Sequence, residues 1–142
     1  MIDTNLLLLM IIGGVDEGRY IEKSKRLNGF CVEDYYRLWN FVKCYEEVWI
    51  TPYIAAEVSN LIDLNGEARD RAFELAREIF CQFKQINTSV FDDCKGIFFI
   101  KFGLADSSII DLSGEFDILT NDRRMNVPLY AKSPLRIFNF PV

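Results

Sequence analysis

The sequence predicts an α/β fold, a three-layer α/β/α sandwich in which helices cover both faces of a short, mostly parallel central sheet. Short apolar runs rich in branched and aromatic residues alternate along the chain with longer stretches that repeat at helical spacing. No repeat or Pro/Gly/Ser-rich linker interrupts this alternation. We therefore expect residues 1–142 to form a single domain.

The first part of the chain is predicted to contain a strand, two helices and a long connection. Ile2 ends the strand, and polar residues 3–5 cap a buried helix that Gly13 and Gly14 terminate. Residues 19–28 form a polar, basic connection. Over residues 32–45 apolar side chains recur every three or four positions, which predicts an amphipathic helix.

The remaining elements follow from caps, periodicity and glycine positions. A strand over residues 48–50 leads to a helix that Thr51 caps and Pro52 begins. Residues 67–83 keep the helical period, with Arg and Glu on the outer face. Two shorter helices, 93–102 and 105–112, end at glycines, and a weak helix, 124–131, separates strands at 116–120 and 136–140.

The composition excludes several classes of protein. The chain has no histidine, which removes the usual general base of serine, cysteine and histidine-pair hydrolases. Four cysteines, at 31, 44, 81 and 94, lack the CxxC spacing of a zinc site, and we expect those at 31, 44 and 81 to be buried, reduced thiols. The apolar run 6–12 is shorter than the ~18 residues of a membrane span and lacks the basic flank of a secretory signal. We expect a cytoplasmic protein with no membrane contact.

Four acids form the candidate functional site: Asp3, Glu57, Asp106 and Asp122. Asp3 and Asp122 follow predicted strands, and the carboxyl ends of parallel strands share one edge of a sheet. Helical spacing places Glu57 and Asp106 among apolar neighbours, whereas Asp63 and Asp111 point away from them. Carboxylates gathered at one edge repel, and Mg²⁺ or Mn²⁺ relieves that repulsion with the oxygen ligands these cations prefer.

Each acid also has a purely structural interpretation. Asp3, Asp106 and Asp122 could each cap a helix, and Glu57 could be a buried acid paired with an arginine. A metal site would use short polar groups beside the acids to orient its ligands. The candidates for that supporting role are Thr4, Asn5, Ser107, Thr120 and Asn121.

Four segments carry these acids, at residues 2–6, 51–58, 104–110 and 118–123. Their order and spacing resemble the PIN-domain family of metal-dependent ribonucleases, over essentially the whole chain. The resemblance implies a PIN-like sandwich whose four acids bind one or two Mg²⁺ or Mn²⁺ and cleave RNA with a metal-activated water. Many members of this size are toxins of type II toxin–antitoxin pairs, so it also implies an antitoxin partner and a homodimer.

Contacts to RNA are expected from local basic clusters, because the net charge of −5 disfavours phosphate binding over the whole surface. The candidate phosphate contacts are Lys23, Lys25 and Arg26 in the basic connection, and Arg123 and Arg124 beside Asp122. A solvated surface is the other interpretation of both clusters. Tyr35, Tyr36 and Trp39 could stack on unpaired bases, although a core or a partner groove suits them better.

The sequence therefore predicts a Mg²⁺- or Mn²⁺-dependent endoribonuclease. A catalytically silent PIN-like module that binds RNA or a protein is the main alternative. A nuclease acting on DNA flaps or single strands shares the same acidic edge, but the short chain shows no helices for gripping a duplex.

Overall fold

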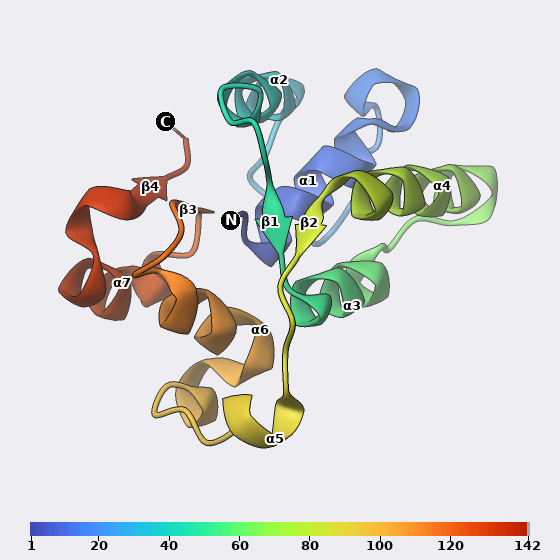
Figure 1. The fold of residues 1–142 in the computed structure, drawn as a ribbon. Helices are drawn as coiled ribbons and strands as arrows, with labels where there is room; N and C mark the ends of the chain where they lie inside the picture. Colours follow the sequence, from blue (N-terminus) through green and yellow to red (C-terminus); the bar gives the residue numbers. More distant parts are fainter. Residues whose placement is uncertain (142) are drawn as a thin grey trace.

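The computed structural model describes residues 1–141 as a mixed α/β fold with short parallel strands (Figure 1). Strand β1 (Trp49–Ile50) pairs with β2 (Lys84–Gln85), and β3 (Ile118–Thr120) pairs with β4 (Ile137–Asn139). Ile2 adds a parallel bridge to Leu119 on the other side of β3. The predicted α/β class is confirmed, but the described strands form two small sheets instead of one central sheet. The extended segment at Ile2 exchanges two backbone hydrogen bonds with Leu119 of β3, at 3.0 and 2.9 Å.

Helix α1 (Thr4–Gly13) is the centre of the molecule, and nearly all of its residues are buried. Its apolar side chains occupy every face, which suits a helix surrounded by others. It contacts α2 (Val32–Val42), α3 (Pro52–Leu61) and α4 (Gly66–Gln82). Gly13 allows the close approach of α2, since a Cβ there would lie 2.3 Å from Cδ2 of Tyr35.

Helix α3 begins as predicted. The side chain of Thr51 caps it by accepting a hydrogen bond from the amide of Ile54 at 3.3 Å, and Pro52 occupies the first turn. The hydroxyl of Thr51 also lies 3.4 Å from that of Ser108. This contact links the start of α3 to α6 (Phe99–Leu112).

Gly103 divides α6 into two helical pieces. Its backbone, at φ 76° and ψ −179°, is in a region that only glycine adopts readily. The boundary predicted at this residue is therefore confirmed. The helix predicted from residue 93 is wrong at its start, because α5 (Val90–Asp93) ends there and α6 begins only at Phe99.

The C-terminal part surrounds the β3–β4 pair. After β3 the chain forms a short 3-10 helix (Arg123–Met125), α7 (Asn126–Lys132), a second 3-10 turn (Pro134–Arg136) and β4. Lys132 and Arg136 donate to backbone carbonyls at the end of α6 and just beyond it. These two basic side chains therefore fasten the C-terminal part to α6.

Two further sequence predictions have clear outcomes. Cys44 and Cys81 are exposed and Cys31 is half-buried, so the prediction of buried thiols is wrong. Helix α2 ends at Val42, short of the predicted residue 45, and this leaves Cys44 outside the packed face. Within residues 1–141, none of the helices combines the length and the apolar character that crossing a membrane requires.

Candidate functional site

Asp3 is buried at the carboxyl end of the extended segment that bridges β3, with only 2% of its surface exposed. One carboxylate oxygen accepts from the amide of Leu6 at 2.9 Å and thereby caps α1. The other accepts from the hydroxyl of Thr120 at 2.5 Å and from the amide of Asn121 at 2.9 Å. Burial raises the pKa of Asp3 above its usual value even though these donors oppose the shift. Asp3 thus joins α1 to the end of β3.

Glu57 lies on α3 and is exposed, which corrects the prediction that it faces the apolar side of its helix. The helix ends at Leu61, so residue 64, one of the apolar neighbours assumed for Glu57, is not part of it. The hydroxyl of Thr4 donates to Oε2 of Glu57 at 2.8 Å. Glu57 is therefore held at the rim between the start of α1 and the middle of α3.

Asp106 lies in the second piece of α6, just after the break at Gly103, and 21% of its side chain is exposed. Asp111, further along the same helix, is exposed, as predicted. The cap interpretation of Asp106 is wrong, because the residue lies inside the helix. Its only ion pair within residues 1–141 is a long one, 3.8 Å from Oδ2 to Nη2 of Arg124.

Asp122 follows β3 and caps the short 3-10 helix by accepting from the amide of Arg124 at 2.9 Å. The cap interpretation is therefore correct for Asp122, as it is for Asp3. The guanidinium of Arg124 also binds both carboxylate oxygens of Asp122. The guanidinium of Arg124 lowers the pKa of Asp122 below its usual value.

The four acids influence one another electrostatically. Burial, followed by the negative charges of Asp122, Glu57 and Asp3 in that order, raises the pKa of Asp106 from 3.8 to about 6, against the opposing effect of Arg124. Carboxylates contribute in this way only when they lie near each other. The structure therefore brings the four predicted acids together near the carboxyl ends of β3 and of the extended segment at Ile2.

The carboxylate oxygens of the four acids are ligands of the kind that a divalent cation prefers. In the described structure, these side chains do not converge on one point. Within residues 1–141, no group of three or more His, Cys, Asp or Glu side chains is positioned so that it could hold a metal ion. Arg124 forms ion pairs with Asp106 and Asp122, and its positive charge partly neutralises their negative charge. The Oδ1 atom of Asn121 is buried and has no hydrogen-bond partner in the described chain, so an oxygen acceptor remains available beside Asp3. Oxygen donors and excess negative charge fit Mg²⁺ or Mn²⁺.

The predicted supporting residues have different surroundings. Thr4, Thr120 and the amide of Asn121 bind the acids directly, as described above. Ser107 is buried, and its hydroxyl donates to the carbonyl of Leu104 at 3.4 Å instead. Asn5 is half-buried on the first turn of α1. The contact of Ser108 with Thr51 was missed, because one serine among several on a helix carries no signal of its partner.

The basic residues fall into two groups. Lys23, Lys25 and Arg26 are exposed on a connection that Asp63 anchors, since its carboxylate accepts from the hydroxyl of Ser24 at 2.7 Å and the amide of Lys25 at 2.8 Å. Arg123 and Arg124 are exposed next to Asp122. Within residues 1–141, Arg124 is the member of these groups that contacts the acids directly.

The aromatic candidates for base stacking pack mainly inside. Tyr35 and Trp39 are partly buried against the core and lie edge to face, with ring centroids 6.5 Å apart. Tyr36 is half exposed. The described geometry favours a packing role for Tyr35 and Trp39.

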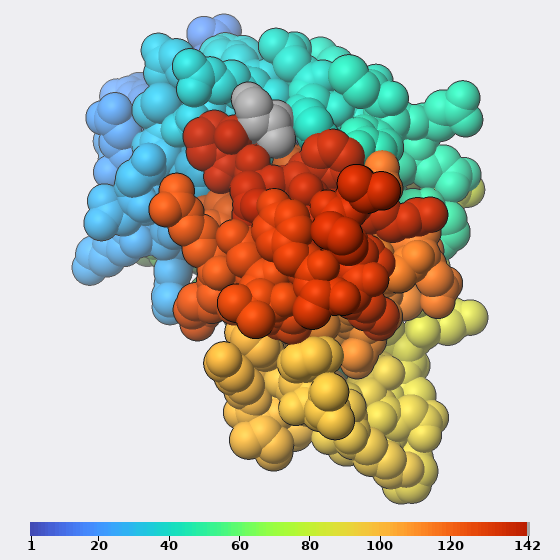
Figure 2. Space-filling view, turned by 90° about the vertical axis from the view of Figure 1, so that its left-hand side faces the viewer, coloured from blue at the N-terminus to red at the C-terminus, as the bar shows by residue number. Residues whose placement is uncertain are grey.

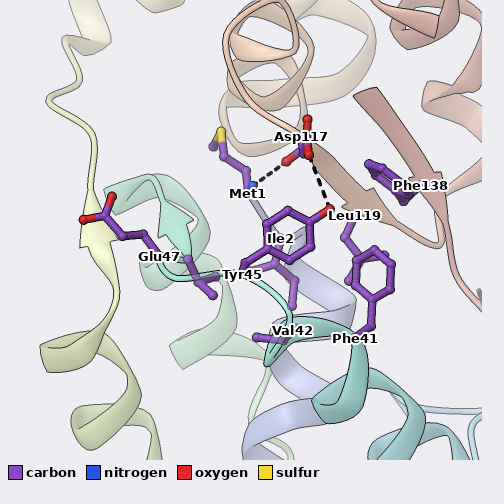
Figure 3. A pocket seen from close by; sticks show the side chains of 10 residues that line it. Met1, Ile2, Phe41, Val42, Tyr45, Glu47, Asp117, Leu119 and Phe138 are labelled. Atoms are coloured by element: carbon purple, nitrogen blue, oxygen red, sulfur yellow. Dashed lines mark hydrogen bonds between the residues drawn. The ribbon is translucent and has the colours of Figure 1, made fainter. Parts of the chain in front are cut away.

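An apolar cavity of about 30 Å³ lies at the opposite edge of the strands (Figure 3). Its walls include Phe41, Val42 and Phe138, and Asp117 at its rim accepts from the hydroxyl of Tyr45 at 3.3 Å. The cavity has room for about one water molecule. It is too small for a nucleotide, and the acids are therefore the stronger candidate site.

The chain was compared with protein-family models, curated proteins and solved structures, and no match was found in any of the three comparisons.

Proposed function

We propose that this chain is a PIN-like, Mg²⁺- or Mn²⁺-dependent endoribonuclease acting in the cytoplasm. The observation that carries the proposal is the raised pKa of Asp106, which results from burial and from three other acids brought near it from distant parts of the sequence. Strongly perturbed carboxylates gathered by burial and like charge are typical of functional sites. The absence of histidine leaves carboxylates and a cation as the means of activating water.

The four acids have different parts in this proposal. Asp106 and Glu57 are the side chains with the most freedom to turn toward a cation, because Asp106 has one long ion pair and Glu57 one hydrogen bond from Thr4. Asp3 is fixed by three donors and positions its neighbours as much as it binds. Asp122 contributes its negative charge and holds Arg124 at the site.

A bound Mg²⁺ or Mn²⁺ would lower the pKa of water and so supply the nucleophile for phosphodiester hydrolysis. The protein's own side chains then have three tasks. Thr4 orients Glu57, Thr120 holds Asp3 in place, and the exposed guanidinium of Arg123 is available to a phosphate of RNA.

Cleavage of a labelled single-stranded RNA tests the function. We expect cleavage with Mn²⁺ or Mg²⁺, no cleavage with EDTA, and a loss of at least about a hundredfold in Asp106→Asn, because an amide carries no charge to hold the cation. Asp111→Asn is the matched control on the same helix and should retain activity. Cleavage in EDTA, or full activity in Asp106→Asn, would refute the proposed mechanism.

A catalytically silent PIN-like module that binds RNA or a protein is the alternative. It keeps the fold but does not need the acids to bind a cation. A calorimetric Mn²⁺ titration discriminates between the nuclease and the silent module. In the silent module Mn²⁺ binds weakly, and Glu57→Gln leaves its affinity unchanged. In the nuclease the same substitution weakens Mn²⁺ binding, because it removes one negative charge from the cluster.

The proposed partners are RNA, an antitoxin and a second copy of the chain, as in toxin–antitoxin pairs. A protein partner finds support in large exposed apolar side chains from α5 to the start of α6: Phe91 on α5, Ile97 in the connection and Ile100 on α6. Both Figure 1 and Figure 2 show this segment projecting from the rest of the molecule. A reading frame for a small antitoxin beside the gene would support the assignment to this subgroup.

A further inference from the structure

Arg124 makes an unusually complete set of contacts with one carboxylate. Its amide and its Nε donate to Oδ1 of Asp122 at 2.9 and 3.0 Å. Nε also donates to Oδ2 at 2.9 Å, and Nη2 donates to the same oxygen. A carboxylate has about four acceptor positions, so Arg124 fills those of Asp122.

The same guanidinium reaches a second acid. Nη2 of Arg124 lies 3.8 Å from Oδ2 of Asp106. Arg124 thereby bridges the end of β3 to α6 and contributes positive charge where two of the four acids face each other. A divalent cation that binds Asp122 competes with Arg124, because the guanidinium engages both oxygens of that carboxylate.

Nothing in the packing fixes Arg124 in this position. Three-quarters of its side chain is exposed, compared with 13% for Asp122. An ion pair with one exposed partner is easily exchanged for solvent or another anion. The planar fork that grips a carboxylate also matches a phosphate.

We propose that Arg124 is a positioning residue that alternates between two anions: it occupies the carboxylates of Asp122 and Asp106 in the cation-free protein, and it binds an RNA phosphate once a divalent cation takes those carboxylates. The inference rests on the proposed function, on its cation site for the first half and on RNA as the substrate for the second. Titration with Mn²⁺ in the absence of RNA tests the first half separately.

The first test is calorimetric titration of the full chain with Mn²⁺ in the absence of RNA. Because Arg124 competes with the cation, Arg124→Gln should bind Mn²⁺ about two- to fivefold more tightly than the wild type. Arg124→Lys keeps the charge but loses the fork, and it should also bind more tightly. Arg123→Gln, which removes the same charge from the neighbouring position, should change the affinity less than Arg124→Gln does.

The second test measures binding of a fluorescent single-stranded RNA, in EDTA and in Ca²⁺ as a probe cation. Arg124→Gln should weaken RNA binding severalfold in Ca²⁺ and leave it unchanged in EDTA, where the acids hold Arg124. Arg123→Gln should weaken RNA binding equally in both conditions.

Three results would overturn the inference: unchanged or weaker Mn²⁺ binding in Arg124→Gln, an equal loss of RNA binding with and without the cation, or no Mn²⁺ binding by any variant. The failure of the nuclease proposal gives a different result. In that case RNA is not cleaved, yet Arg124→Gln still binds Mn²⁺ more tightly than the wild type.

Discussion

Asp106 differs from the other acids because its charge is the least compensated. Asp3 accepts three hydrogen bonds and Asp122 is bound by a guanidinium, whereas Asp106 has one partner at 3.8 Å. Burial and the neighbouring negative charges raise its pKa to about 6, and Arg124 opposes that shift only in part. A carboxylate in this state destabilises the folded protein when it ionises, and a cation removes the cost.

Substituting Asp106 by Asn should therefore stabilise the metal-free protein at pH 7. The folded-state pKa is raised, so this group's contribution to stability is complete below about pH 4 and is lost as the pH rises through about 6. Above that pH the ionised acid costs on the order of 1–3 kcal/mol, which the neutral amide avoids. Urea unfolding in EDTA at pH 4 and pH 7 measures the difference.

Asp111→Asn is the control for this prediction, since Asp111 is exposed on the same helix. It should change the unfolding free energy by less than about 0.5 kcal/mol at either pH. An Asp106→Asn protein that is no more stable than the wild type at pH 7 would show that the acid is not under electrostatic strain.

Mn²⁺ affinity should depend on pH through the same group. The cation binds ionised carboxylates, so the apparent affinity should rise by up to about tenfold per pH unit below 6 and level off above it. Titrations between pH 5 and 7.5 test this expectation. In Asp106→Asn the curve should be flatter, and an identical pH dependence in both proteins would assign the effect to another group.

At the scale of elements, the site depends on where helices begin. Asp3 caps α1, and Thr51 caps α3, the helix that carries Glu57. Gly103 interrupts α6 just before Asp106. Helix caps are read well from sequence, because Asp, Thr-Pro and glycine have strong local preferences. This explains why three of the four acids could be assigned to their elements in advance.

Gly103→Ala should disturb α6 and the acid it carries. A side chain is strained at φ 76° and ψ −179°, at a cost of about 1–3 kcal/mol. We expect a lower unfolding free energy together with weaker Mn²⁺ binding. Gly114→Ala is the control, because the nearest atom to its new Cβ lies 3.6 Å away and no positive φ is needed. Equal stability of the two variants would contradict this account of the break.

The pairing of strands and the contacts between helices could not be predicted in the same way. Strand β2 has only Lys84 and Gln85, both exposed, so no apolar alternation marks it. The position of Glu57 depends on how α3 packs against α1. Its hydrogen bond from Thr4 joins residues that are far apart in the sequence. The bridge from Arg124 to Asp106 is of the same kind, since periodicity within one segment says nothing about it.

At the scale of the whole molecule, the segment from α5 to the start of α6 projects from the rest of the chain (Figure 2). Several large apolar side chains on this segment are exposed. Ile97 and Ile100 are 85% and 90% exposed, which is unusual for isoleucine. An exposed apolar segment of this kind fits an interface with another chain.

Ile100→Glu should therefore convert the proposed homodimer into a monomer, because it places a charge within the apolar contact. Light scattering coupled to size-exclusion chromatography measures the mass. Leu135→Glu is the control, since Leu135 is 93% exposed but lies on the turn before β4. A monomeric wild type, or a dimer that persists in Ile100→Glu, would argue against this surface as the dimer interface.

We have proposed that Asp3, Glu57, Asp106 and Asp122 together bind a divalent cation. Anomalous diffraction from crystals containing Mn²⁺ tests it most directly. We expect an anomalous peak within about 2.5 Å of carboxylate oxygens of Asp106 and at least one other of the four acids, with Arg124 displaced from Asp122. A crystal saturated with Mn²⁺ that shows no peak among these acids, with Arg124 still bound to Asp122, would contradict it.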